Sequence, residues 1–138
     1  MINKIIHKKK ILAIIIKKYR SKKGITFFTN PKDTQQIGYM KHKKNHIIQP
    51  HTHKKKLKKI MYTTEVLIIL KGSLKVDFYD NRKKYLFSKK ITKGEIIMLM
   101  NGGHGFKVLK DLEMIEVKQG PYKLSYDKNK FKDTKKLN

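Results

Sequence analysis

Short apolar segments separated by turn signals fill the second half of the chain, and this spacing constrains the fold more than any other feature. The segments between about residues 62 and 118 are broken by KG, DNRK and TKGE. In SLKVDFY, apolar residues alternate with Lys75 and Asp77, as in a strand with one buried face. Strands at this spacing, with no convincing long helix, predict an all-β antiparallel sandwich or barrel.

Two of these segments are apolar on both faces. EVLIIL, which begins at Glu65, and IIMLM, which begins at Ile96, lack the alternation that solvent on one side would require. We therefore expect both strands to be covered on both faces. A second subunit is an economical source of the outer layer, which predicts a homodimer. The N-terminal strands are the alternative source of that layer.

The first third of the chain contains further strand candidates. ILAIIIKK and GITFFT are rich in β-branched and aromatic residues, and Asn30-Pro31 ends the second of them. IGYMKHK and HIIQPHTHK follow, with Pro50 at an edge or a bend. The basic start and ILAIII could begin a signal peptide, but lysines close the run and no small-residue cleavage site follows. No stretch has the length of a membrane span, so we expect a cytoplasmic protein.

Composition limits the partners and the metal ligands. The 138-residue chain carries a formal net charge of +25, nearly all from lysine, and it contains no cysteine. Any metal must therefore be held by nitrogen and oxygen. The charge favours anionic ligands, but nucleic-acid readout favours arginine, and only Arg20 and Arg82 are present. We expect no dedicated nucleic-acid function, because an AT-rich genome accounts for the lysines. A lysine-driven polyanion-binding protein is an alternative.

Histidines and one acid form the candidate site. On a strand, the side chains of His51 and His53 share one face about 6.6 Å apart. Glu65 interrupts an apolar segment, where a carboxylate is costly to bury without a partner. His104 follows two glycines that allow the backbone to approach closely. Three imidazoles and one carboxylate suit divalent Fe, Mn, Ni or Zn and leave positions open for a substrate. Polar lining of a barrel without metal is the alternative.

These motifs resemble those of the cupin superfamily over about residues 37–122. The matching residues are His51-Thr52-His53, then Glu65 and Gly72, then Gly94-Glu95, IIMLM and Asn101-Gly102-Gly103-His104. The chain departs from the family pattern in the long lysine-rich stretch before Glu65 and in Met100, where the family usually has proline.

The resemblance implies a double-stranded β-helix, or jelly-roll barrel, with one divalent transition metal. Its ligands would be His51, His53, Glu65 and His104. It also implies three segments: N-terminal strands packing on the barrel (1–36), the barrel (37–122) and a polar C-terminal tail (123–138). Similar small single-domain bacterial cupins are often linked to polysaccharide or sugar metabolism.

Five other residues are candidates for substrate contacts. Glu116 and Lys118 alternate with apolar residues on the last strand, so they could serve as acid and base at the barrel mouth or simply face outward. Leu67 and Phe106 would line the cavity if the metal ligands point inward, and belong to the core otherwise. Tyr122 would close the pocket or end the strand.

Together these features predict metal-dependent chemistry on a small polar or anionic metabolite, such as a sugar or sugar-nucleotide derivative. Isomerase, epimerase and dioxygenase reactions all remain open, because a metal can polarise a carbonyl or bind adjacent oxygens. A noncatalytic metal-dependent ligand-binding or sensor module is the alternative, because no acid or base beyond the ligands is assigned. We expect no membrane partner.

Overall fold

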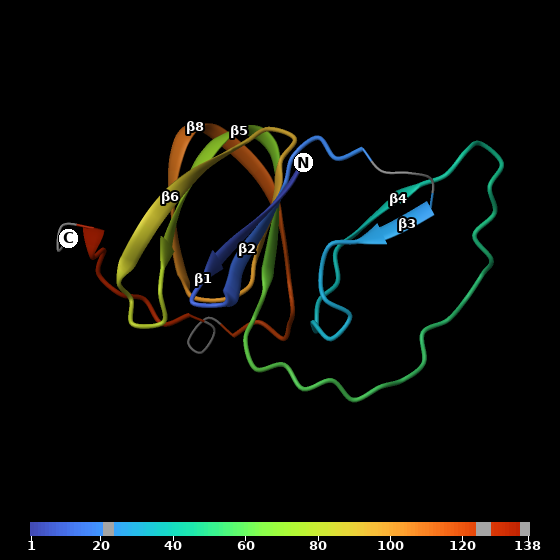
Figure 1. The fold of residues 1–138 in the computed structure, drawn as a ribbon, viewed down its shortest axis with the longest axis horizontal. Helices are drawn as coiled ribbons and strands as arrows, with labels where there is room; N and C mark the ends of the chain where they lie inside the picture. Colours follow the sequence, from blue (N-terminus) through green and yellow to red (C-terminus); the bar gives the residue numbers. More distant parts are fainter. Residues whose placement is uncertain (21–23, 124–127, 136–138) are drawn as a thin grey trace. The chain divides into compact units, whose positions relative to one another are not determined.

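The computed structural model describes residues 1–20, 24–123 and 128–135, which form two compact units (Figure 1). One combines Met1–Tyr19 with Tyr62–Asn138, and we call it the sheet unit. The other is Arg20–Met61, the hairpin unit. This division follows contacts in the structure, while the three segments expected from the sequence stay a prediction.

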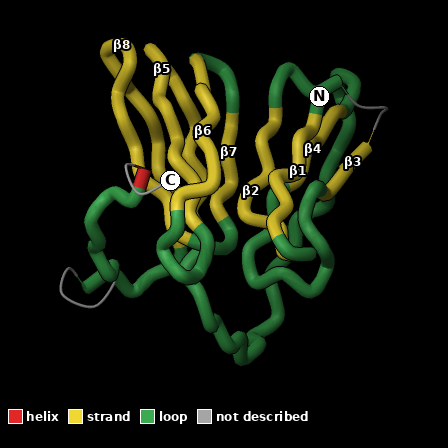
Figure 2. Tube along the Cα trace, turned by 60° about the vertical axis from the view of Figure 1, so that its left-hand side comes forward, coloured by secondary structure: helices red, strands yellow, loops and turns green. Residues whose placement is uncertain are grey.

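Six antiparallel strands make up the sheet unit (Figure 2). They are β1 (Ile2–His7), β2 (Lys10–Ile16), β5 (Glu65–Tyr79), β6 (Tyr85–Thr92), β7 (Ile96–Leu99) and β8 (Gly103–Lys118). Their order is β1-β2-β7-β5-β6, and β8 pairs with the other edge of β5. The predicted all-β antiparallel class is confirmed. No helix in the described part of the chain is long and apolar enough to cross a membrane.

The sheet curls into a half-barrel because its two longest strands bend together (Figure 1). The register between β5 and β8 shifts at three places, all between Ile69 and Leu74. Such irregularities increase local twist and bend a strand. The break expected at Lys71-Gly72 is wrong, because β5 runs through both residues. Gly72 has φ +78°, a backbone conformation that glycine adopts without steric cost.

Alternation along the bent strands builds the core. Side chains of β2, β5, β6 and β7 fill the concave face with Ala13, Ile15, Leu67, Ile69, Leu74, Val76, Phe78, Ile91, Ile97 and Leu99, each at most 4% exposed. The apolar positions of SLKVDFY point into this core, as predicted. Burying this surface supplies the main favourable free energy of folding.

The outer face of the central strands is buried as well. Ile14 pairs with Met98, which pairs with Val66, and none of the three is more than 7% exposed. The expected two-sided burial of IIMLM and of the start of EVLIIL is therefore confirmed. It ends before Leu70, which is 46% exposed. β1 and β2, the N-terminal strands, extend the same sheet. The homodimer, as a source of the outer layer, stays a prediction.

β8 forms an edge of the sheet. It pairs with β5 along its length, and no second strand pairs with it among the described residues. Its exposed apolar side chains are Phe106, Val108, Leu109, Ile115 and Val117. The strand is therefore long, exposes several apolar side chains and is open on one side.

The hairpin unit contains β3 (Gly24–Phe27) paired with β4 (Gly38–Lys41). The loop between them is held by the Gln36 amide, which donates to the carbonyl oxygens of Asn30 and Asp33 at 2.8 Å. The strand expected over HIIQPHTHK is wrong, because residues 42–64 form no strand. This stretch has many lysines and Pro50, and its side chains are mostly exposed, so it offers no apolar face to pair or pack.

We predict that Gly72→Ala destabilises the sheet unit far more than Gly94→Ala. Both glycines have φ near +80°, so both substitutions pay the left-handed cost of about 1 to 2 kcal/mol. A Cβ at Gly72 would lie 1.8 Å from the Asp111 carbonyl oxygen, whereas at Gly94 it meets nothing within 4 Å. We expect Gly72→Ala to lower the free energy of unfolding by at least about 3 kcal/mol in urea titrations. Equal losses in the two variants would contradict the close packing at the bend.

Candidate functional site around Glu65 and His104

The bend of β5 and β8 brings two distant side chains together. Glu65 is the first residue of β5 and pairs with Lys118, whereas His104 pairs with Phe78 at the far end of β5. If the strands were straight, the Glu65–Lys118 pair and the Phe78–His104 pair would lie about 43 Å apart. Yet His104 Nε2 lies 3.1 Å from Glu65 Oε2. The curled sheet therefore joins residues that are 39 positions apart in the sequence.

Glu65 is a buried carboxylate that stays charged. It is 6% exposed, while the His104 side chain is 28% exposed. The hydrogen bond with His104 holds the pKa of Glu65 below its ordinary value, although burial alone would raise it. Lys128 Nζ lies 3.7 Å from Glu65 Oε1, and Lys118 adds a further positive charge. The Glu65 carboxylate is therefore an ionised group that can bind a cation.

His51 and His53 belong to the hairpin unit, where both side chains are exposed. Their ring centroids lie 5.5 Å apart, edge to face. His51 Nδ1 lies 2.9 Å from the carbonyl oxygen of Gln49. A carbonyl only accepts, so Nδ1 carries the proton and donates. In the neutral ring Nε2 then keeps its lone pair.

The described residues of neither unit group a complete metal site. In the described part of each unit, no three histidine or acidic side chains are arranged to hold a metal ion. Of the four expected ligands, the structure brings Glu65 and His104 together in the sheet unit. Their role as metal ligands, and that of His51 and His53, stays a prediction.

The expected substrate-contact residues have different surroundings. Leu67 is 1% exposed and lies in the core. Phe106 is 41% exposed, with its ring 5.2 Å from that of His104. Lys118 Nζ lies 3.7 Å from Glu116 Oε1 and 4.1 Å from the ring centre of Tyr122. Phe106 is therefore the accessible apolar neighbour of the Glu65–His104 pair.

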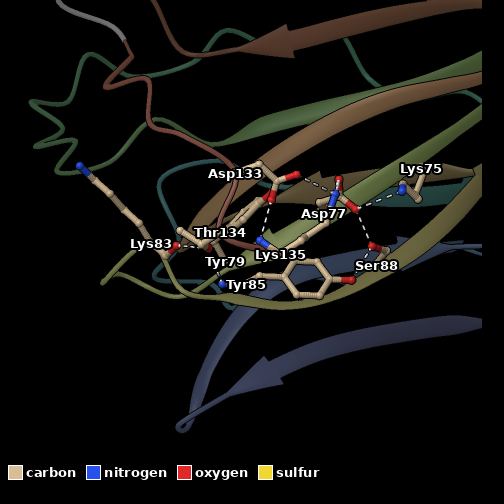
Figure 3. Close-up of polar contacts among 9 residues, drawn as sticks. All are labelled: Lys75, Asp77, Tyr79, Lys83, Tyr85, Ser88, Asp133, Thr134 and Lys135. Carbon is tan, nitrogen blue, oxygen red and sulfur yellow. Dashed lines mark hydrogen bonds and ion pairs between the residues drawn. The ribbon is translucent and has the colours of Figure 1, made fainter. Parts of the chain in front are cut away.

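A second polar cluster was not predicted from the sequence (Figure 3). Its centre is Asp77, which is 5% exposed on the outer face of β5. The Ser88 hydroxyl donates to one carboxylate oxygen of Asp77, and the Lys135 ammonium binds the other. The Tyr85 hydroxyl lies 2.8 Å from Ser88 Oγ. The sequence signal was present, because Asp77 is an acid within an alternating apolar strand.

This cluster attaches the C-terminal tail to the sheet (Figure 3). The Tyr79 hydroxyl donates to Asp133 at 2.9 Å, and burial raises the pKa of Tyr79 to about 12. Thr134 accepts a hydrogen bond from the Tyr85 amide at 3.0 Å. The Phe131 ring lies edge-on to Tyr79 at 5.1 Å. Residues 131–135 therefore dock on the sheet, and the cluster is a structural anchor.

Comparison with known proteins found no family model, no curated protein and no solved structure that matches this chain.

We predict that His104→Ala raises the pKa of Glu65 in chelator-treated protein. The variant removes the largest cause of the lowered pKa and leaves the opposing effect of burial. Lys128→Ala should produce a smaller rise, because its contact at 3.7 Å is exposed. The pKa can be followed by NMR of the Glu65 side-chain carboxyl carbon. A larger rise in Lys128→Ala than in His104→Ala would show that the hydrogen bond is not the main cause.

The same contact predicts how pH changes stability. The folded pKa of Glu65 is lowered, so its contribution is present above the unfolded value of about 4.3. It is lost as the pH falls through the folded pKa. The difference in unfolding free energy between wild type and Glu65→Gln should therefore shrink on acidification, as measured by urea titrations at a series of pH values. A difference that grows as the pH falls would contradict this sign.

We predict that Asp77 and Lys135 are energetically coupled. Asp77→Ala removes the buried carboxylate that binds Lys135 and Ser88, which keep Asp133 and the Tyr85 hydroxyl as partners, at a cost of about 2 kcal/mol. In a double-mutant cycle with Lys135→Ala, the coupling should exceed about 1 kcal/mol in urea unfolding. Lys132→Ala, at an exposed tail position, should change stability by less than about 0.5 kcal/mol. Additive effects of the two substitutions would argue against the anchor.

Proposed function

We propose that the sheet unit is a cupin-type barrel that binds one divalent transition metal and acts on a small polar or anionic metabolite. Glu65 and His104 would be two of the ligands, and His51 and His53 would complete the set. The single observation that carries the proposal is the contact between the buried Glu65 carboxylate and His104, joined from opposite ends of the paired strands. The contribution of His51 and His53 is supported by the sequence motif.

The donor chemistry of these residues fits a divalent transition metal. Imidazole nitrogen and carboxylate oxygen are ligands for Fe, Mn, Ni and Zn. Glu65 is ionised, which ligation requires. His51 donates its Nδ1 proton to a backbone carbonyl, the arrangement that commonly orients metal-binding histidines. A metal bound here would supply a Lewis acid for carbonyl or adjacent hydroxyl oxygens of a substrate.

Residues around the pair favour an anionic or sugar-like substrate. Lys118 and Lys128 place positive charge beside Glu65, which favours anions nearby. The half-exposed Phe106 ring, next to His104, offers a flat apolar surface to a ligand. Glu116, close to Lys118, is the candidate to move a proton at the substrate. These roles suit isomerase, epimerase or dioxygenase chemistry.

Elemental analysis of untagged protein tests the ligand assignment. We expect about one metal ion per chain in wild type, and loss of metal in Glu65→Gln, His104→Ala and His51→Ala, because each removes a donor. His46→Ala, another histidine of the hairpin unit, should keep its metal. Circular dichroism would confirm that each variant is folded. Full occupancy in folded Glu65→Gln, or no metal in wild type, would overturn the assignment.

Turnover separates an enzyme from a sensor. Metal-loaded protein should convert a member of a panel of sugars, sugar nucleotides and keto acids, with oxygen consumption followed in parallel. Saturable binding of a panel member without turnover would instead identify a noncatalytic ligand-binding module. Binding that responds only to ionic strength, and that is unchanged by metal removal, would favour a polyanion-binding protein.

A further inference from the structure

A cleft of about 260 Å³ lies in the sheet unit, beside two tight turns. We call it the turn cleft. It is lined by His7, Lys8 and Lys10 at the β1–β2 turn, by Asp80, Asn81 and Arg82 at the β5–β6 turn, and by Leu12 and Asn101. None of the expected metal ligands or substrate-contact residues lines it.

The turn cleft carries excess positive charge. Lys8, Lys10 and Arg82 are cationic, and Asp80 is its one acid. Asp80 Oδ1 accepts hydrogen bonds from the backbone amides of Arg82 and Lys84, each at 2.9 Å, so this carboxylate is committed to the turn. These bonds hold the pKa of Asp80 below its ordinary value. The charge of Lys8 also contributes to this lowered pKa, but within the described chain no ion pair joins Asp80 directly to Lys8, Lys10 or Arg82.

His7 contributes a polar atom that needs a partner. Its Nε2 is buried, and no hydrogen-bond partner for it exists among the described residues. Buried polar atoms are almost always paired, with protein, water or ligand. His7 is one of the residues that line the cleft, with this unpartnered nitrogen covered by the surrounding atoms.

The backbone of both turns is strained in a way that favours a role in binding. Lys8, Lys9 and Lys83 have φ values of 45°, 65° and 66°. Tight hairpin turns with positive φ normally use asparagine or glycine. Lysine at these positions makes the turn less favourable while adding positive charge at its tip. Strained non-glycine residues collect at ligand-binding sites.

We propose that the turn cleft binds a small oxyanion, namely a phosphate group that is either free or part of a phosphomonoester. The volume falls just below the range of about 300 to 1,000 Å³ typical of sites for drug-sized ligands, so a phosphate group with a small ester substituent has room in it. Lysine and arginine both bind phosphate through charge-assisted hydrogen bonds, and arginine does so with two parallel donors. Asn81 and Asn101 add neutral polar groups to the wall.

The site does not depend on the proposed metal. The strand register nevertheless places the Leu12 wall of the cleft toward the same end of the sheet as Glu65. Leu12 is next to Ala13, Ala13 pairs with Leu99, and Leu99 pairs with Glu65. A phosphate held in the cleft is therefore at the end of the sheet where the candidate site lies. Binding of phosphate and binding of metal can be measured separately.

Backbone amide NMR on the metal-free full chain provides the test. Inorganic phosphate is titrated at constant ionic strength, with chloride as the replaced anion, and phenyl phosphate is titrated in a second arm. We expect saturable shifts at Lys8, Lys9, Asn81 and Arg82. The arm with the tighter affinity identifies whether free phosphate or a phosphomonoester is preferred.

Three variants make the test specific. Lys8→Asn removes a cation while keeping a residue that accepts positive φ, and Arg82→Gln removes the second turn's cation; each should weaken binding about tenfold. Lys90→Gln, an exposed lysine of β6 outside the cleft, is the matched control and should bind as wild type does. Equal weakening in Lys90→Gln, shifts spread over the whole surface, or no saturation would overturn the proposal.

Discussion

The bend of the β5–β8 pair is the constraint on which the rest of the sheet unit depends. Without it, the two strands would form a flat ribbon with Glu65 and His104 at opposite ends. The bend requires a residue with positive φ and no side chain, because the Asp111 carbonyl occupies the space that a Cβ would need at Gly72. Core packing, the half-barrel shape and the candidate site all follow from this local geometry.

The Glu65–His104 pair places chemistry inside an apolar framework. A buried carboxylate needs a partner, and His104 satisfies that requirement. If the His104 Nε2 proton makes this hydrogen bond, a metal bound to the same nitrogen must replace the proton. Metal binding at this site would therefore be coupled to proton release. In this exchange the metal would take the place of the His104 proton beside the Glu65 carboxylate.

Much of the fold could be predicted from the sequence because SLKVDFY alternates and because DNRK and TKGE mark real turns, whereas Lys71-Gly72, expected as a turn, lies inside β5. β1 was missed, since INKIIH has a mixed pattern and its turn is made by lysines at positive φ, where asparagine or glycine would be the usual signal. The strand through Pro50 was wrong because short apolar runs without a buried face lack a pairing partner. Local pattern identifies strands well, but it does not identify their neighbours.

The candidate site was predictable in part for the same reason. The acid within an apolar strand and the histidine after glycines were assigned to one metal site, and the structure brings Glu65 and His104 into contact. The same signal at Asp77 was interpreted as an exposed charge, because its partner Lys135 lies in a tail with no periodic pattern. The turn cleft could not be predicted, since it requires residues from three separate loops to meet.

The open edge of β8 has a consequence for how copies of this protein behave in solution. A long edge strand with unpaired backbone groups is a template for another strand. Lys107 and Lys110, exposed on that strand, and the net charge of +25 repel an approaching copy. Salt shortens the range of this repulsion to about 8 Å at physiological ionic strength and to about 3 Å at 1 M. The repulsion that opposes pairing of two β8 edges therefore weakens as the salt content of the medium rises.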